Sequence, residues 1–400
     1  MVCNPRKFLI IGAGFSGAVL ARQLAEEMDC RIEVWDERDH VGGNCHTERD
    51  PDTGVMVHCY GPHIFNTNND KVWAYVNRFG EFRPYVNRVK AVTSKGVFSM
   101  PINLLTINQF FGKTMGPDEA KNFVSSLGDQ SIRQPGNFEE QALKMMGRDL
   151  YETFFKGYTI KQWGCDPVEL PASVLKRLPI RFNYDDNYYD KKHQGIPAGG
   201  YTEVIRNILD HPSISVTLGK RFLPSDISQI KEAYDHLFYT GPIDAFFNHS
   251  EGRLGYRTVT FERIPTAVQD FQGTAVINYP DQSVLWTRIH EHKHFAPWEE
   301  HPGTAVFREY SRETGDEDPP YYPKRLAGDK QLLHRYREMA HSMQVAKTVS
   351  NNFGVSFLGR LATYRYMDME AVIGEAIQLS AILADAWNAG VPLPIFPNVE

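Results

Sequence analysis

The stretch Phe8-Leu9-Ile10-Ile11-Gly12-Ala13-Gly14-Phe15-Ser16-Gly17 decides the fold of the N-terminal part of this 400-residue chain. Four consecutive apolar residues are typical of a central parallel strand that is buried on both faces. In the G-x-G-x-x-G pattern that follows, the first glycine permits a tight turn, the second lets the backbone approach a pyrophosphate, and the third lets a helix pack closely on the strand. The stretch therefore predicts a Rossmann-like unit with dinucleotide contacts at Gly12, Gly14, Phe15, Ser16 and Gly17.

The residues that follow favour FAD over a nicotinamide cofactor. Apolar residues recur at helical spacing from Leu20 to Met28. A second apolar stretch, 32–35, ends at Asp36, whose carboxylate can accept hydrogen bonds from a ribose diol. The glycine-rich segment 41–44 is similar to the one that follows the ribose-binding acid in large FAD-binding oxidases and hydroxylases. We therefore expect FAD to be held also by Asp36, Glu37, Arg38, Gly43 and Asn44.

Composition and charge are those of a globular enzyme. The chain is 42% hydrophobic and 23% charged, and its length suggests two or three domains. A net charge of −6 gives no basic surface for nucleic acid. The apolar run 8–11 is far shorter than the ~20 residues that cross a bilayer. Five scattered cysteines without a CxxC pair argue against a disulfide framework and a zinc site. These observations predict a cytoplasmic protein with neither membrane nor metal.

Several long motifs together resemble one known family. They are 60–65 (YGPHIF), 155–164 (FKGYTIKQWG), 176–188 (KRLPIRFNYDDNY), 194–201 (QGIPAGGY) and 359–369 (GRLATYRYMDM). The chain is similar, from its first strand to its last helix, to the bacterial UDP-galactopyranose mutases. The resemblance implies an α/β fold, in which a Rossmann-like FAD-binding domain accompanies an inserted helical bundle and an antiparallel β-sheet domain.

The resemblance also implies an activity. Members of this family are flavin-dependent isomerases that interconvert UDP-galactopyranose and UDP-galactofuranose without net redox change, for cell-wall polysaccharide biosynthesis, and the resemblance implies a homodimer. In the family, N5 of reduced FAD attacks galactose C1 as UDP leaves. The resulting flavin–sugar iminium opens and recloses the sugar ring.

Domain boundaries follow from the motifs and the hydrophobic pattern. We expect the FAD-binding domain to combine residues 1–75, about 195–245 and 340–400, with a strand at 355–357 and a helix over 369–387. Residues from about 100 to 175 should form the helical domain, followed by a mobile loop over 176–195. The antiparallel sheet should use about 76–100 and 250–325. Apolar, β-favouring runs predict its strands at 276–279, 284–289 and 305–307.

The resemblance implies that Arg177, Arg288 and His63 are catalytic residues. Paired arginines and an aromatic pair are the main candidate groups for holding the substrate. Two guanidiniums can chelate a diphosphate bidentately, and the resemblance assigns this to Arg177, on the mobile lid, and to Arg288. Phe154 and Tyr158 are four residues apart, so on a helix they share a face and could grip uracil. The resemblance places Trp163 near the sugar.

The resemblance assigns further roles residue by residue. It places His63 beside the flavin, where an imidazole can tune the reduced ring, although a lone histidine is more often structural. Tyr188, Tyr322 and Tyr366 would reach the diphosphate, and ordinary anchoring at a surface is the alternative for these tyrosines. Further substrate-binding or cofactor-binding positions are Arg257, Asn278, Gly359, Arg360, Asp368 and Met369.

Other interpretations of the chain remain. His290, His292 and His294 alternate, so a strand would present three imidazoles on one face as a metal site does. No matching cysteine or carboxylate is apparent, and we expect no metal. An FAD-dependent amine oxidase or desaturase would share the first domain, and so would a non-catalytic FAD- or nucleotide-binding module. The paired arginines favour a nucleotide sugar instead.

Overall fold

A five-stranded parallel sheet forms one end of the molecule. The computed structural model describes residues 5–177, 180–345 and 353–397, without the side chains of 176–177 and 344–345. The sheet has the strand order β10, β2, β1, β11, β17, and every neighbouring pair is parallel. Its strands are β1 (Arg6–Ile11), β2 (Cys30–Trp35), β10 (Ile214–Thr217), β11 (His236–Tyr239) and β17 (Gly354–Phe357). The expected strand at 355–357 is therefore present.

Alternate residues of β1 supply the cores on the two faces of this sheet. Phe8 and Ile10 pack toward α1 (Phe15–Glu27), α7 (Tyr201–Leu209) and α12 (Met369–Asn388), whereas Leu9 and Ile11 belong to the core on the opposite face. That second core includes residues of α9 (Ile243–Phe246) and α10 (Ala327–Val345). Burial on both faces explains why the strand sequence is apolar without alternation. Other elements near this sheet are α2 (Asp70–Asn77), α8 (Ile227–Ala233) and α11 (Gly359–Ala362).

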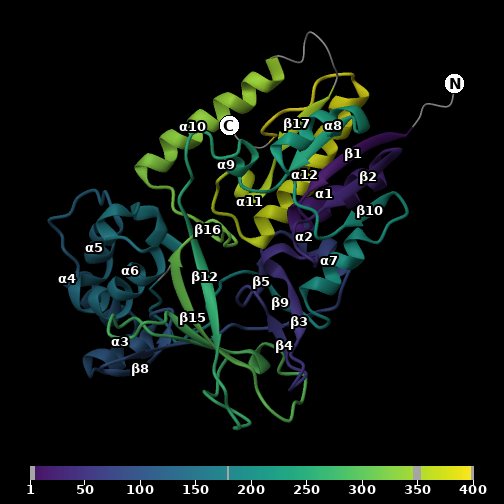
Figure 1. Cartoon of the computed structure of the whole chain (residues 1–400). Helices are drawn as coiled ribbons and strands as arrows, with labels where there is room; N and C mark the ends of the chain where they lie inside the picture. The colour runs from purple at the N-terminus through teal and green to yellow at the C-terminus, as the bar shows by residue number, and fades with distance from the viewer. Residues whose placement is uncertain (1–4, 178–179, 346–352, 398–400) are drawn as a thin grey trace.

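A seven-stranded sheet lies between the parallel sheet and a helical layer (Figure 1). Its order is β16 (Tyr322–Pro323), β12 (Tyr256–Arg263), β15 (Val306–Glu313), β14 (Arg288–Glu291), β13 (Val276–Asn278), β7 (Val89–Thr93) and β8 (Gly96–Met100). It is antiparallel except that β13 and β7 are parallel. The sheet expected to be antiparallel thus contains one parallel pair, which joins Val89 to Val276, 187 residues later in the sequence.

The strand expected over 284–289 was also wrong in its first half. Residues 279–287 form the connection between β13 and β14, and Leu285 is 76% exposed. Asp281 organises the connection, because its carboxylate accepts a hydrogen bond from Ser283 N (2.9 Å) and its carbonyl one from Val284 N. An aspartate that bonds the backbone two residues ahead favours a turn over the apolar run that follows it.

Helices between residues 104 and 163 cover the other side of the seven-stranded sheet, on the left in Figure 1. They are α3 (Leu104–Phe111), α4 (Pro117–Leu127), α5 (Phe138–Tyr151) and α6 (Gly157–Trp163), with a π-helical turn, Glu152–Lys156, between the last two. Phe138, Met146 and Leu150 are buried among the β7 and β8 side chains. A π turn of this kind shifts the helical register by one residue and is frequent at functional sites.

Two small sheets complete the fold. One pairs β3 (Thr47–Arg49) with β4 (Met56–His58), and the other has the order β5 (Phe65–Thr67), β9 (His193–Pro197), β6 (Phe82–Pro84). β6 lies within the range expected for the antiparallel sheet domain, but it pairs with β9 instead. Within the described part of the chain, no helix combines the length and apolar character that a bilayer-spanning segment needs.

Candidate functional site

Close backbone contacts shape the glycine turn at the start of α1. Gly12 has φ +107°, which L side chains rarely adopt, and a Cβ on Gly17 would lie 2.0 Å from the carbonyl oxygen of Gly12. Gly14 and Gly43 pass each other so closely that a Cβ on Gly43 would lie 3.2 Å from the Cα of Gly14. The N-terminus of α1 has no side-chain cap. The turn is therefore narrow, free of side chains, and opens onto the positive end of a helix.

Asp36 joins this turn to the end of β2. Its carboxylate is 8% exposed and accepts hydrogen bonds from Ala13 N (2.7 Å) and Arg38 N (2.9 Å), one on each oxygen. Each oxygen keeps a second lone pair for a hydroxyl group. Glu37 is exposed and pairs with Arg221 at 3.6 Å.

Arg38 supplies a positive charge beside the turn. It donates to Asn44 Oδ1 (2.9 Å) and lies over the Tyr60 ring, 4.4 Å from its centroid. Its buried Nη1 has no hydrogen-bond partner among the described residues. An unpaired buried donor is costly, and the oxygen of a phosphate or ribose would satisfy it. The residues expected to hold FAD here thus fit a dinucleotide.

The C-terminal segment lies beside the same turn. Gly359 has φ +82°, and a Cβ there would lie 2.3 Å from Ser16 Oγ. Asp368 caps α12 by accepting a hydrogen bond from Ala371 N (3.0 Å). Ser380, in the second half of α12, donates to Glu27 at the C-terminal end of α1 (3.2 Å), so the two packed helices run in the same direction and their N-termini point to one region. Arg360 adds a positive charge there. It donates to the carbonyl oxygens of Met367 (2.8 Å) and Tyr321 (3.1 Å), and no described carboxylate pairs with it.

Arg288 stands at the first position of β14, and a buried carboxylate fixes it. Glu309, opposite it on β15, is fully buried and accepts from Arg288 Nε (2.9 Å) and Nη2 (2.7 Å). Thr287 and His290 also donate to this carboxylate, at 3.1 and 2.9 Å. The Arg288 and His290 contacts lower the pKa of Glu309 to about 2. Arg288 Nη1 makes no hydrogen bond to any described residue, so one edge of the guanidinium can take an anion.

Tyrosines surround this guanidinium. Burial raises the pKa of Tyr158, Tyr188 and Tyr322. The nearby positive charge of Arg288 offsets part of this increase in each. For Tyr322 the pKa rises to about 12. Tyr322 stacks on Tyr366, with ring centroids 6.0 Å apart and planes 14° apart. At neutral pH these phenols are protonated, so they can donate hydrogen bonds to an anion without adding negative charge.

His63 is a neutral imidazole near the same groups. Its Nδ1 is 2.7 Å from the carbonyl oxygen of Gly61, which assigns the ring proton to Nδ1 and leaves Nε2 as an acceptor. Burial lowers its pKa to about 4, and the charges of Arg360 and Arg288 act in the same direction. Of the two charge states the sequence left open, neutral pH therefore selects the uncharged one.

The residues expected at uracil and the sugar lie on and around α6. Phe154 is 4% exposed, with its ring edge-on to Phe98 at 5.2 Å, so much of its surface serves the helical core. Tyr158 and Trp163 are partly buried. Asn278 ends β13 and pairs in register with Arg288, and its buried Oδ1 has no partner among the described residues. An amide oxygen without a hydrogen-bond donor is suited to accept a hydrogen bond from an N–H group of a base.

Arg257 and Arg177 are the two other arginines that the sequence places at the substrate. Arg257 is 3% exposed and donates to the carbonyl oxygens of Gln162 (3.0 Å) and Lys161 (3.1 Å) and to Glu313 (2.7 Å). It therefore holds the C-terminal end of α6, and its contact with substrate stays a prediction. The side chain of Arg177 lies outside the described residues.

The three alternating histidines do not form one row: the ring centroids of His290 and His292 are 6.2 Å apart, but the chain turns before His294. β14 ends at Glu291, and His292–Phe295 form a 3₁₀ turn. His290 bonds Glu309, His292 Nδ1 accepts from His58 N at 3.2 Å, and His294 is 3.2 Å from Asp270. His294, Asp270 and Glu291 bring three potential ligand atoms together, but Lys293 already pairs with Asp270 at 3.3 Å. This arrangement is an ion-pair cluster at the end of the strand.

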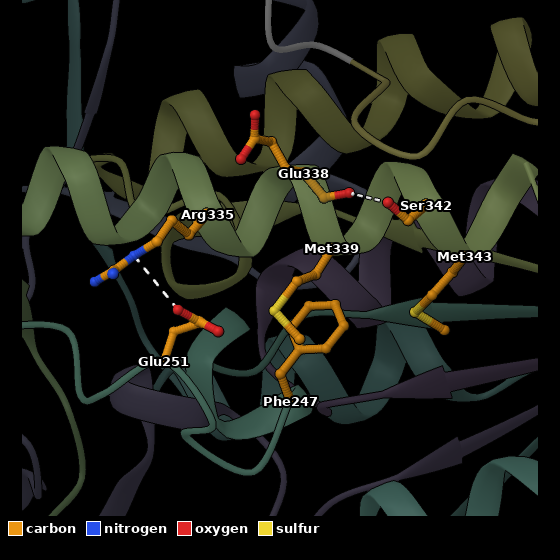
Figure 2. A pocket seen from close by; sticks show the side chains of 7 residues that line it. All are labelled: Phe247, Glu251, Arg335, Glu338, Met339, Ser342 and Met343. Carbon is orange, nitrogen blue, oxygen red and sulfur yellow. Dashed lines mark hydrogen bonds and ion pairs between the residues drawn. The ribbon is translucent and has the colours of Figure 1, made fainter.

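A groove of about 610 Å³ lies elsewhere, beside α10 (Figure 2). Figure 2 shows Glu251 facing Arg335 across it, at 3.5 Å, and Met339 over the ring of Phe247. The lining residues are Phe247, Glu251, Arg335, Glu338, Met339, Ser342 and Met343, and the site residues expected from the sequence are not among them.

Sequence reasoning missed two members of the site. Glu309 gave no local signal, because its role depends on the register between β14 and β15. Tyr189 lies near Tyr188 and Arg288. Burial raises the pKa of Tyr189, and the positive charge of Arg288 acts against this increase. The two adjacent tyrosines pack edge to face at 5.3 Å. The sequence signal for Tyr189 was its place directly after Tyr188, the last residue of the 176–188 motif.

Comparison with known proteins identifies the family. The model of the family "GLF: UDP-galactopyranose mutase" matches residues 153–366, more than half of the chain, and that of an NAD(P)-binding Rossmann-like domain matches 10–79. A probable UDP-galactopyranose mutase of Klebsiella pneumoniae is 52% identical over 98% of both chains. A dTDP-fucopyranose mutase of Escherichia coli is 49% identical over 94% of this chain and 98% of its own length.

Solved structures agree on the fold. The crystal structure of reduced UDP-galactopyranose mutase superimposes with a TM-score of 0.69 at 15% identity, covering 98% of this chain and 95% of that one. A putative protoporphyrinogen oxidase from Exiguobacterium gives 0.61 at 12% identity, with coverages of 95% and 98%. These likenesses confirm the expected α/β fold with a Rossmann-like domain and several sheets. The family matches confirm the relationship inferred from the motifs, and the chain belongs to the UDP-galactopyranose mutase family.

Proposed function

We propose that this protein interconverts UDP-galactopyranose and UDP-galactofuranose, with reduced FAD as cofactor. The observation that carries the proposal is Arg288, which a buried Glu309 fixes on one edge while its Nη1 is left available among protonated tyrosines. A guanidinium with one free edge suits a phosphate oxygen, and phenol donors extend the anion site without repelling the anion.

The glycine turn supports FAD as the cofactor. The narrow passage between Gly14 and Gly43, the unpaired Nη1 of Arg38 and the two converging helix N-termini would hold the pyrophosphate and ribose. When bound, reduced FAD supplies the electron pair that opens and recloses the sugar ring without net redox change.

The chain's own residues would bind and orient the substrate. Arg288 would hold the diphosphate, and the mobile-lid arginine expected from the sequence, Arg177, would close over it and exclude water. Tyr158 and Asn278 would receive the base, the first by its ring and the second by its unpaired amide oxygen. Neutral His63 would present the lone pair of Nε2 beside the cofactor, where it can accept a proton or a hydrogen bond.

A dTDP-linked 6-deoxy sugar is the second candidate substrate. The specific observation is that the dTDP-fucopyranose mutase is 49% identical to this chain, against 52% for the probable UDP-galactopyranose mutase. The two substrates differ by one sugar hydroxyl, one ribose hydroxyl and one methyl group on the base. Sites that bind a hydroxyl reject its absence strongly, so turnover of the two substrates should differ clearly.

The setting of the enzyme belongs to the same proposal. The chain would act in the cytoplasm as a homodimer and provide galactofuranose for cell-wall polysaccharide. The unpaired thiols of Cys30, Cys45, Cys59 and Cys165 support a reducing compartment.

The decisive experiment is turnover by the dithionite-reduced, flavin-replete enzyme. Chromatography should show UDP-galactofuranose converted to UDP-galactopyranose, and an oxidised sample serves as the control. Preferential turnover of dTDP-fucofuranose would transfer the assignment to the second candidate. A reduced, flavin-loaded preparation that converts neither substrate would refute the proposal.

A further inference from the structure

Lys161 directs its ammonium group into the connection between β13 and β14. Its Nζ donates to the carbonyl oxygens of Asp281 (2.8 Å), Val284 (2.9 Å) and Trp286 (3.0 Å), and also to that of Tyr279. An ammonium has three N–H groups, so four carbonyl oxygens surround it with no donor to spare. Burial lowers the pKa of Lys161 to about 8, which leaves the group charged at pH 7.

Four carbonyl dipoles that converge on one point need a cation. The same backbone arrangement coordinates alkali ions in proteins, and without a positive charge the oxygens repel one another. We therefore expect the connection 279–287 to hold its shape because the lysine of α6 occupies its centre. The exposed Leu285 shows how little apolar burial the tip of the connection contributes.

Helix α6 and the connection are also in direct contact. A Cβ on Gly157, at the start of α6, would lie 2.3 Å from the carbonyl oxygen of Pro280. Arg257 holds the other end of α6 through the carbonyl oxygens of Lys161 and Gln162. Ser311 of β15 also donates to the carbonyl oxygen of Gln162 (2.7 Å), so several contacts attach the helix to the sheet, and the side chain of Lys161 makes the one that reaches the connection.

Both attached segments carry residues of the proposed substrate site. Asn278 and Arg288 are the residues on either side of the connection and pair with each other in register. Tyr158 lies one turn before Lys161 on α6. Any movement of the connection relative to α6 would change the distance between the base-binding ring and the guanidinium that binds the diphosphate.

We propose that Lys161 is a positioning residue, whose ammonium–carbonyl cage locks the connection 279–287 to α6 and so sets the spacing between Tyr158 and Arg288. This inference rests on the proposed function, because a UDP-sugar is the ligand that spans that spacing. The lock acts on substrate binding, and among the described residues the hydrogen bonds of the Lys161 ammonium go to the connection and not to the glycine turn 12–17, so flavin should stay bound.

The test compares Lys161→Met, which keeps the apolar stem, with the control Lys121→Met at an exposed position of α4. We expect the Kd of the oxidised holoenzyme for UDP, and the KM of the reduced enzyme, to rise roughly tenfold in Lys161→Met, since several hydrogen bonds from a charged donor are lost. The kcat should change by less than about threefold, and flavin content should stay the same. Lys121→Met should match the wild type.

Two further measurements separate the lock from general stability. Hydrogen exchange should quicken in residues 279–287 of Lys161→Met, but not in the parallel sheet. In Lys161→Ala, n-propylammonium should restore UDP affinity, whereas tetramethylammonium, which has no N–H, should not. Unchanged exchange in 279–287, or a lower unfolding midpoint with an unchanged Kd for UDP, would overturn the inference. If the wild type neither binds nor converts UDP-sugars, the proposed function fails, and the exchange measurement still decides whether Lys161 locks the connection.

Discussion

Replacing Glu309 with glutamine tests the charge arrangement that fixes Arg288. The wild-type carboxylate is fully buried and accepts hydrogen bonds from Arg288, Thr287 and His290. Glutamine keeps the shape, but it has no charge and its amide nitrogen cannot accept. Arg288 would then be a buried cation whose partner carries only a dipole.

The pKa of Glu309 gives the size of the effect. The folded protein lowers it from 4.5 to about 2, and each unit corresponds to 1.36 kcal/mol, so the carboxylate contributes about 3 kcal/mol. This agrees with the roughly 3–5 kcal/mol lost when a buried ion pair is broken from one side. We therefore expect Glu309→Gln to lower the free energy of unfolding by about 3 kcal/mol at pH 7.

The effect should depend on pH in a defined direction. Because the folded-state pKa is the lower one, the stabilisation is complete above about pH 4.5 and is lost as the pH falls toward 2. The glutamine variant has nothing to lose, so the difference between the two proteins should shrink in acid. Urea unfolding of the holoenzyme at pH 7 and pH 3.5, followed by tryptophan fluorescence, measures both values.

A matched control is Glu262→Gln on β12. Glu262 is exposed and accepts from Tyr310 Oη at 2.6 Å, so its replacement should leave the unfolding midpoint nearly unchanged. The reasoning is refuted if Glu309→Gln unfolds at the wild-type midpoint at pH 7. It is also refuted if the deficit of Glu309→Gln is as large at pH 3.5 as at pH 7.

Three further predictions concern the cofactor, the diphosphate and the buried histidines. Gly17→Ala should yield protein without the flavin absorbance near 450 nm, because its Cβ would lie 2.0 Å from a carbonyl oxygen, whereas Gly328→Ala, with open space around it, should stay yellow. Arg288→Lys should keep flavin but raise the KM for the nucleotide sugar at least tenfold in steady-state assays, since one ammonium cannot serve both the carboxylate and a phosphate. His58 and His63 have pKa values lowered by burial to about 3 and about 4, so unfolding takes up protons below pH 6.5. Stability should therefore fall between pH 6.5 and 4 by up to about 1.4 kcal/mol per pH unit for each histidine, and His63→Asn should reduce the slope of urea midpoint against pH.

The parts of the fold that local chemistry dictates were predictable from the sequence. The strand, glycine turn and helix from Arg6 to Glu27 form as expected, because an apolar run and three glycines leave few alternatives. The parallel pairing of β13 with β7 was not predictable, because nothing near either strand encodes a partner about 185 residues away. The apolar run 284–286 misled for a related reason, since the carbonyl oxygens of Val284 and Trp286 accept from the ammonium of Lys161 and not from a neighbouring strand.

The candidate site shows the same division between local and long-range information. Gly12, Asp36 and Gly43 could be predicted to lie together because the strand–turn–helix–strand motif that carries them has one known arrangement. Glu309 could not, because nothing in 306–313 distinguishes it from the exposed charges on either side until the register with β14 is known. A buried carboxylate becomes visible only together with the cation that it holds.

Arg257 illustrates how a correct residue type can conceal its role. Sequence comparison suggests a substrate contact, yet its guanidinium is 3% exposed and bonds two carbonyl oxygens at the end of α6 together with Glu313. Lys161 on the same helix uses its charge in the same way, on carbonyl oxygens of the connection 279–287. Such cations belong to a binding motif as much as groups that touch substrate do, because the geometry of the site depends on both. A charged residue in a binding motif is therefore assigned to substrate only when one of its donors has no partner in the described protein, as is the case for Nη1 of Arg288.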